Sequence, residues 1–287
     1  MTGSSNQQSG PHVPPGGFDA LMPEQMAERA ETAGAQKTRG PVTKLLALSV
    51  LAGAFVTIGV LFALNVAAGG SGALLPGLAF STAVILVVVG GAELFTSNNL
   101  MVMALVSRRI RARELVDAWL IVYLGNLVGS VATVGMAVLA GQAARLDGAL
   151  AERAAAVAAR MAETGAVEAF FRGVLGNVLV CMAVWLSYSA RTTTDRVLAV
   201  IPPVTAYYVM GLEHAVTVMV YMPLAVTAGA MEPQAGMTLA WPGGAGAGTV
   251  AGDFLAHLAP VTAGNVVGGG VLVGAVYWFI YLHGRHR

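Results

Sequence analysis

The chain has 287 residues, of which 56% are hydrophobic and 11% are charged. Soluble domains carry about 25% charged residues, so this composition indicates a membrane protein. The net charge of +1 argues against a nucleic-acid partner, and the single cysteine, Cys181, excludes an intrachain disulfide and a multi-cysteine metal site.

The first 40 residues divide into two parts. Residues 1–17 are polar and rich in Gly, Pro, Ser and Gln, so we expect a disordered or processed tail and no secretory signal. Residues 18–40 mix apolar positions such as Phe18, Leu21 and Met26 with acidic residues, which predicts a short amphipathic helix and a linker. Two placements are open for this helix: in the membrane interface, or as a soluble terminal helix.

Residues 41–284 predict a domain of six membrane-spanning segments. We expect them near residues 44–68, 76–107, 114–141, 167–190, 197–229 and 254–282. Two long apolar stretches around the second and fifth segments contain Glu93 and Glu213 as their only acidic or basic residues apart from His214. Each would measure ~50 Å or more as one helix, whereas a hydrocarbon core is ~30 Å thick. We therefore predict two broken helices, interrupted near residues 94–99 and 211–217.

Basic residues predict the orientation of these segments. Lys and Arg gather in the N-terminal segment, in residues 108–113 and 191–196, and at the C-terminus. Short cytoplasmic loops carry an excess of Lys and Arg, so we expect both termini to be cytoplasmic.

The sequence also contains an internal repeat. Gly125-Asn126-Leu127-Val128-Gly129 in the third segment resembles residues 264–268 (GNVVG) in the sixth. Glu93 and Thr96 at the first break match Glu213 and Thr217 at the second. Because each half has three segments, the halves must insert with opposite topology, which predicts two inverted three-helix repeats.

His214 is the strongest functional candidate because it is a histidine deep in an apolar segment. An ionisable side chain at membrane depth is costly and marks a transport route by default. The alternative is a structural histidine bound to a neighbouring helix. Glu213 and Glu93 precede the breaks, where they would pair with His214 or cap backbone N–H groups.

Three further polar residues complete the candidate route. Thr96 lies in a polar stretch, residues 95–99, that fits irregular backbone; it would bond His214 and a solute, or cap the resuming helix. Asn177 and Asn265 must face the protein interior, either as links between helices or along the route. The sequence has no nucleotide-binding or hydrolase motif and no metal-ligand set, so we expect no enzymatic activity and no cofactor.

Together, these segments resemble the formate/nitrite transporter family, whose members conduct formate, nitrite or hydrosulfide in bacteria. The supporting segments are GAELFTS at 91–97, GNLVG at 125–129, GNVLVCMAVW at 176–185, GLEH at 211–214 and PVTAGNVVGGG at 260–270. The resemblance implies an aquaporin-like, all-α protomer, a homopentamer in the lipid of the bacterial cytoplasmic membrane, and a channel domain at 41–284.

The resemblance also assigns roles to individual residues. His214 corresponds to the central histidine, and Thr96 to the threonine of the first break; Asn177, Glu213 and Asn265 correspond to polar residues near the pore. Leu94 and Phe95 would form the cytoplasmic constriction, and Phe80, Val180 and Tyr207 the outer one, although spacing alone favours packing roles for all five. Arg172 would attract anions into a vestibule. We expect a small weak-acid anion to be protonated near His214; the alternative is an aquaporin-like channel for neutral solutes.

Overall fold

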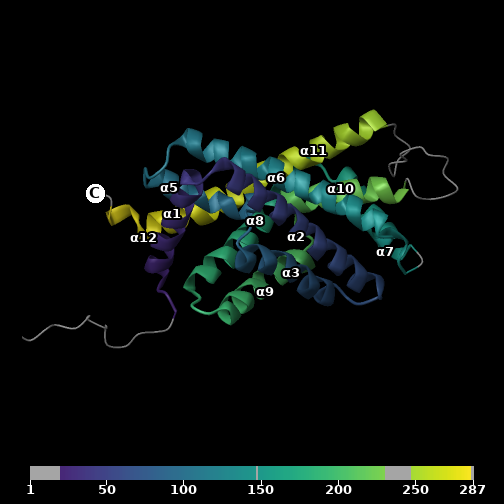
Figure 1. Cartoon of the computed structure of the whole chain (residues 1–287), viewed down its shortest axis with the longest axis horizontal. Coiled ribbons are helices and arrows are strands. Elements are labelled where there is room, and N and C mark those ends of the chain that lie inside the picture. The colour runs from purple at the N-terminus through teal and green to yellow at the C-terminus, as the bar shows by residue number, and fades with distance from the viewer. Residues whose placement is uncertain (1–19, 147, 230–246, 286–287) are drawn as a thin grey trace, which may run out of the picture.

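The structure is a computed structural model that describes residues 20–146, 148–229 and 247–285 (Figure 1). Every regular element in this part of the chain is helical. The first half contains α1 (Pro23–Arg39), α2 (Val42–Ala68), α3 (Leu74–Gly90), α4 (Phe95–Asn98), η1 (Asn99–Met101), α5 (Val102–Val106) and α6 (Ala112–Leu139). The second half contains η2 (Gln142–Ala144), α7 (Ala149–Glu163), α8 (Ala166–Ser189), α9 (Thr193–Val209), α10 (Ala215–Gly229), α11 (Ala247–Asn265), η3 (Val266–Ala275), α12 (Val276–Tyr281) and η4 (His283–Arg285).

Within the described residues, four continuous helical stretches are long and apolar enough to cross a membrane: α2, α6, α8, and the run Gly252–Tyr281 from α11 to α12. A fifth span forms if α3 is joined to α4–α5, which meet at a bend of 57°. The apolar part of α10, Ala215–Thr227, is shorter. These helices start and end within a few residues of the predicted segments.

The first break differs from the prediction. The helix stops at Gly91, whose φ of +76° suits a residue without a side chain, and helical backbone resumes at Phe95. The polar stretch 95–99 is therefore helical rather than irregular, and Leu94, not Thr96, occupies the N-cap position. The second break lies between α9 and α10, where Gly211 has a φ of +63°.

Small residues bring two helix pairs into close contact. A Cβ at Gly53 or Gly129 would collide with backbone atoms across the α2–α6 contact. Gly264 and Gly268 occupy the same kind of position where the α11–η3 run crosses α8. Such close backbone approach is how helices pack in lipid, where the hydrophobic effect does not drive them together.

The N-terminal helix packs on the body of the protein. Met26, Ala27 and Ala30 of α1 are buried in one cluster with Trp185 and Leu282, and α1 lies beside α5 and α12 (Figure 1). Arg109 Nη2 contacts the buried Glu31 Oε2 at 2.9 Å. Phe18, predicted to begin the apolar face, lies outside the described residues.

One helix was not predicted from the sequence. Residues 149–163, expected to be a connection, form α7, which lies against α10. Its buried residues Leu150, Ala154, Ala158 and Met161 follow helical spacing, a pattern that the many alanines of this segment obscure.

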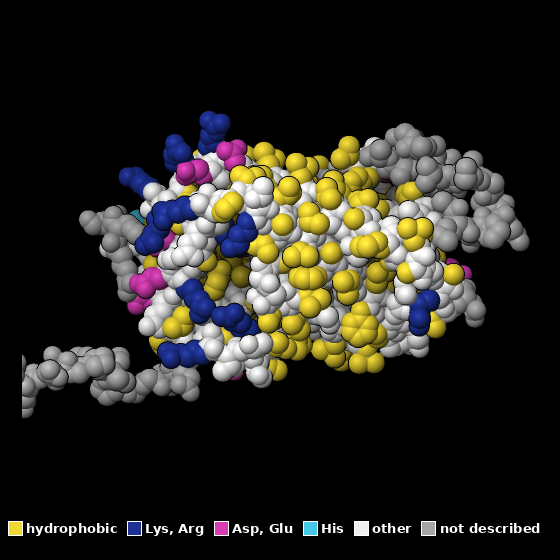
Figure 2. Space-filling model, in the orientation of Figure 1, with side chains coloured by type: hydrophobic (Ala, Val, Ile, Leu, Met, Phe, Trp, Pro, Cys, Tyr) yellow, Lys and Arg dark blue, Asp and Glu magenta, His cyan; other side chains and the backbone are white. Residues whose placement is uncertain are grey.

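The molecular surface is banded. Apolar side chains cover the middle of the face shown in Figure 2, while Lys and Arg gather at the end where α1, α5 and α12 lie. The apolar band includes exposed side chains of α6 such as Leu120, Leu124 and Val128. Apolar surface of this extent requires lipid or another protein to cover it.

Candidate functional site

Two asparagines hold the breaks in the same way. At the first break, Asn126 Oδ1 accepts a hydrogen bond from the Phe95 N–H at 2.8 Å, and its Nδ2 donates to the Glu93 carbonyl at 2.9 Å. At the second, Asn265 Oδ1 accepts from the Ala215 N–H at 2.8 Å, and its Nδ2 donates to the Glu213 carbonyl at 3.3 Å. Each asparagine thus satisfies backbone groups that the interrupted helix leaves unpaired.

These bonds align the two breaks residue by residue. Glu93 corresponds to Glu213, and Leu94 to His214. The Ser97 hydroxyl donates to the Leu94 carbonyl at 2.9 Å, as the Thr217 hydroxyl donates to the His214 carbonyl at 2.8 Å. The sequence match of Thr96 with Thr217 is therefore out of register by one residue, because Ser97 is the residue that takes the place of Thr217.

His214 is fully buried in the second break. Its Nδ1 accepts a hydrogen bond from the Thr217 N–H at 3.3 Å. Its ring centroid lies 5.4 Å from that of Tyr207 and 6.4 Å from that of Phe80. Nε2 has no partner among the described residues, so this nitrogen is available to a small polar solute.

Thr96 is the second buried group with a free polar atom. Its hydroxyl oxygen also lacks a partner in the described part of the chain, and the structure has no hydrogen bond between it and His214. Its carbonyl accepts from Asn177 Nδ2 at 3.2 Å and contacts Cys181 Sγ at 3.3 Å. Asn177 Nδ2 also donates to the Asn265 carbonyl at 2.7 Å, so it ties the two halves together.

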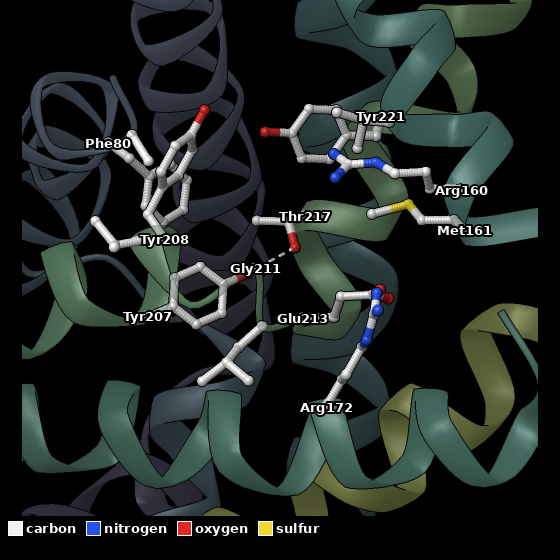
Figure 3. A pocket seen from close by; sticks show the side chains of 14 residues that line it. Phe80, Arg160, Met161, Arg172, Tyr207, Tyr208, Gly211, Glu213, Thr217 and Tyr221 are labelled. Carbon is white, nitrogen blue, oxygen red and sulfur yellow. Dashed lines mark hydrogen bonds and ion pairs between the residues drawn. The ribbon is translucent and has the colours of Figure 1, made fainter. Parts of the chain in front are cut away.

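Glu213 pairs with residues other than His214. Its Oε1 lies 3.3 Å from Arg172 Nη1, and its Oε2 lies 2.5 Å from His257 Nε2 on α11. Figure 3 shows Arg172 extending from its helix toward Glu213. The expectation that Glu213 would bond His214 or cap backbone with its side chain is wrong: charged and ring groups hold the carboxylate, and Asn265 performs the capping.

A cavity of about 270 Å³ adjoins this break. Phe80 and Tyr207 line it with ring centroids 5.6 Å apart, and the Tyr207 hydroxyl lies 3.1 Å from the Thr217 hydroxyl. Arg160 and Arg172 bring positive charge to the other side (Figure 3). Val180 is fully buried in the core and does not line this cavity.

The first break adjoins a second cavity, of about 220 Å³, at the end of the molecule that carries α1. Glu93 lines it and pairs with Lys37 Nζ at 2.8 Å, with no contact to His214. Leu94 is fully buried, and the Phe95 ring packs against Tyr123 and Trp119 of α6. Neither Leu94 nor Phe95 lines this cavity.

Sequence reasoning missed the role of His257 and the partner of Glu93. His257 is buried, so it is a second histidine in the protein interior besides His214. A signal existed: His257 stands eight residues before Asn265, which puts both on the side of α11 that faces α8. Among the residues that the structure describes, no three His, Cys, Asp or Glu side chains gather as metal ligands.

Comparison with known proteins places this geometry among membrane transporters. Residues 24–279 match the family described as formate/nitrite transporter. The formate channel FocA of Escherichia coli is 36% identical over 92% of this chain and 96% of its own length. The uncharacterized transporter YrhG of Bacillus subtilis is 33% identical over 92% of this chain and 95% of its own length.

Two solved structures resemble the fold. A pentameric formate channel with formate bound is 37% identical, has a TM-score of 0.74, and covers 84% of this chain and 98% of its own. An ion channel of the same family superposes with a TM-score of 0.76 at 24% identity, over 89% of this chain and 98% of its own.

Proposed function

Since this chain belongs to the formate/nitrite transporter family, a family of channels and transporters rather than enzymes, we propose that it conducts formate across a membrane. Other small monovalent weak-acid anions, nitrite and hydrosulfide, are candidates at the same site. The observation that carries the proposal is that each break contains a buried polar atom without a partner among the described residues, His214 Nε2 and Thr96 Oγ1, in a chain 36% identical to a formate channel.

The proposed architecture is a homopentamer of six-span protomers built from two inverted repeats. In this arrangement α9 and α10 are the two parts of the broken fifth span, as α3 and α4–α5 are of the second. The matched bonds of Asn126 and Asn265 support the repeat, and the apolar band supports burial in lipid and between protomers. Native mass spectrometry of the purified protein is expected to give a mass of five chains.

The proposed location is a bacterial cytoplasmic membrane with both termini on the cytoplasmic side. The clustering of Lys and Arg at the end that carries α1 and α12 supports this orientation (Figure 2). Residues 41–284 then form the channel, residues 18–40 its cytoplasmic helix and linker, and residues 1–17 a terminal tail.

The mechanism follows from the cost of moving a bare anion through a narrow apolar route. We call the cavity of about 270 Å³ at the second break the outer cavity, and that of about 220 Å³ at the first break the inner cavity. Arg172 and Arg160 raise the concentration of anions in the outer cavity. Phe80 and Tyr207 form the constriction between this cavity and His214, with Val180 behind them. Leu94 and Phe95 form the inner constriction. Between the two, the anion takes a proton near His214 Nε2 and passes as the neutral acid, with Thr96 Oγ1 as a second hydrogen-bonding partner.

The experiment is stopped-flow uptake of formate, nitrite and hydrosulfide into proteoliposomes at about pH 5.5 and about pH 7.5. Neutral transfer predicts faster flux at the acidic pH, because more protons are available to the anion. His214→Asn keeps a polar side chain of similar size but removes the titrating nitrogen. We expect it to lower the maximal rate of uptake about 100-fold or more, the typical contribution of one proton-transfer group, and to remove the pH dependence of that maximal rate.

Each contrary outcome has a definite reading. If His214→Asn preserves both the maximal rate of uptake and its pH dependence, the proposed proton transfer at His214 is wrong, but the proposal of anion conduction stands. If the folded wild type passes no anion at either pH but admits labelled glycerol, the channel carries neutral solutes.

A further inference from the structure

A histidine outside the predicted site contacts the carboxylate next to His214. His257 is 4% exposed, and its Nε2 reaches one oxygen of Glu213 while Arg172 reaches the other. Glu213 and Arg172 line the outer cavity, whereas His257 stands behind them. His257 therefore acts on the cavity only through Glu213.

A carboxylate on the wall of this cavity is at odds with anion conduction, because it repels the substrate. Arg172 offsets it only in part, since its guanidinium also binds Glu168 Oε1 at 2.6 Å. With both glutamates ionised and His257 neutral, the charges of Arg160, Arg172, Glu168 and Glu213 sum to zero. One additional proton, shared by Glu213 and His257, gives this side of the outer cavity a net positive charge.

We propose that Glu213 and His257 form a titrating pair, separate from His214, whose proton uptake raises the affinity of the outer cavity for the anion. The inference rests on the proposed function of the same site. His257 is then a positioning residue, because it touches Glu213 and not the substrate. Its Nδ1 has no partner among the described residues.

The surroundings determine which charges the pair senses. From the packed elements these are Arg172 and Glu168 on α8, Arg160 on α7, Tyr207 on α9, Tyr221 on α10, His214 in the same break, and Asp253 one turn earlier on α11.

Two substitutions are expected to change anion affinity in opposite directions. His257→Asn keeps a hydrogen-bond donor for Glu213 but removes the proton site, so the carboxylate stays charged. Glu213→Gln removes the carboxylate charge at every pH. We measure the KM for formate uptake into proteoliposomes between about pH 5 and about pH 8.

In the wild type, KM is expected to fall roughly three- to tenfold as the pH decreases, the effect of one unit charge several ångströms from the anion. His257→Asn should hold KM at the high, neutral-pH value, and Glu213→Gln should hold it at the low value. His283→Asn is the matched control, because this histidine lies at the other end of the molecule against Trp278 and Phe279. A purely structural role for His257 would lower the amount of folded pentamer without removing the pH dependence of KM.

A second measurement does not depend on transport. The infrared difference spectrum of the purified pentamer between about pH 7.5 and about pH 5.5 is expected to contain a carboxyl signal that Glu213→Gln removes and His257→Asn shifts. If the wild type carries no anion but this signal is present, the proposed function fails and the titrating pair stands. The proposal is overturned if both the KM profile and the infrared difference of His257→Asn coincide with those of the wild type.

Discussion

At the scale of single residues, Asn126 and Asn265 determine the backbone conformation of the two helix breaks through their side-chain hydrogen bonds. Asn265 makes three hydrogen bonds at once: with the Ala215 N–H and with the carbonyls of Gly173 and Glu213. All lie in the protein interior, where an unpaired backbone group costs about 1–3 kcal/mol. The shape of the second break therefore depends on one amide.

Replacing this amide gives the first prediction. We expect Asn265→Ala to destabilise the folded protein by about 3 kcal/mol or more, because up to three buried backbone groups lose their partner. Asn65→Ala is the control: Asn65 donates to the Leu61 carbonyl within its own helix, so we expect a cost of about 1 kcal/mol or less. Thermal unfolding in detergent compares the two, and equal shifts of Tm would contradict this account.

Part of the candidate site could be derived from the sequence, and part could not. His214, Glu213 and Asn265 stand out because polar groups are rare in such apolar segments. Their partners are harder to find. His257 is 44 residues from Glu213 along the chain, and one sequence contains no signal for a contact at that separation. The alignment of the two breaks was also wrong by one residue. Thr96 matches Thr217 in residue type, but Ser97 makes the corresponding hydrogen bond, and hydrogen bonds cannot be read from the sequence.

At the scale of helices, small residues determine how closely the helices pack. Within α6, Gly129 and Gly135 are the same residue type six positions apart, but their surroundings differ. A Cβ on Gly129 would collide with the Val50 carbonyl of α2, whereas a Cβ on Gly135 would meet nothing within 4 Å. Backbone atoms cannot swing aside as a flexible side chain does, so only the first glycine is required by packing.

This contrast gives the second prediction. We expect Gly129→Ala to lower the free energy of unfolding by about 2 kcal/mol or more, because overpacking forces the two backbones apart. Gly135→Ala should be neutral or stabilise by up to about 1 kcal/mol, through the higher helix propensity of alanine. Thermal unfolding of the two purified variants tests the pair. Tolerance of Gly129→Ala would mean that α2 and α6 approach less closely than the structure has them.

The N-terminal helix gives the third prediction. Lys37 lies on α1 and neutralises Glu93 in the inner cavity, where Arg29 and Arg196 also contribute positive charge. Lys37→Gln leaves α1 in place and removes the positive charge paired with the Glu93 carboxylate, which keeps its hydrogen bond from Asn98 Nδ2. Uptake into inside-out vesicles, which expose this face, should then show a KM for formate raised roughly three- to tenfold. Arg113→Gln, at an exposed position of the same end, should leave KM as it is.

The same helix leads to a further hypothesis, that the N-terminal segment closes the pore at low pH. Deleting residues 1–40 should change the pH gating and preserve the peak conductance. Because Met26, Ala27 and Ala30 pack with Trp185 and Leu282, the deletion also exposes apolar surface and should lower Tm. Single-channel recording with a parallel Tm measurement separates gating from stability.

Helix positions in the membrane domain were predictable because apolar length and glycine content constrain them directly. The helix α7 was not predictable, because its many alanines and balanced charges resemble those of a loop that connects two spans. Leu150 and Met161 are buried where α7 packs against α10, and this tertiary contact is not contained in the local sequence of α7. The sequence can therefore specify the spans while leaving unspecified the element that carries Arg160 to the cavity.

At the scale of the whole molecule, charge and hydropathy together predict how the protein sits in a membrane. The end that carries α1, α5 and α12 holds most of the visible Lys and Arg, and an apolar band lies beyond it (Figure 2). The connection between α6 and α7 lies toward the opposite end (Figure 1). The orientation proposed above therefore requires residues 113 and 145 to be on opposite sides of the membrane.

Cysteine labelling tests this orientation with few changes. Cys181 is fully buried, so the wild type is expected to remain unlabelled by a membrane-impermeant maleimide and supplies the background. Arg145→Cys places a thiol at an exposed loop position, which should react from outside intact cells. Arg113→Cys places one at the basic end, where reaction should require permeabilised cells. The opposite labelling pattern would invert the topology and place the cavity lined by Arg160 and Arg172 on the cytoplasmic side. The pair of Glu213 and His257 would then sense cytoplasmic rather than external pH.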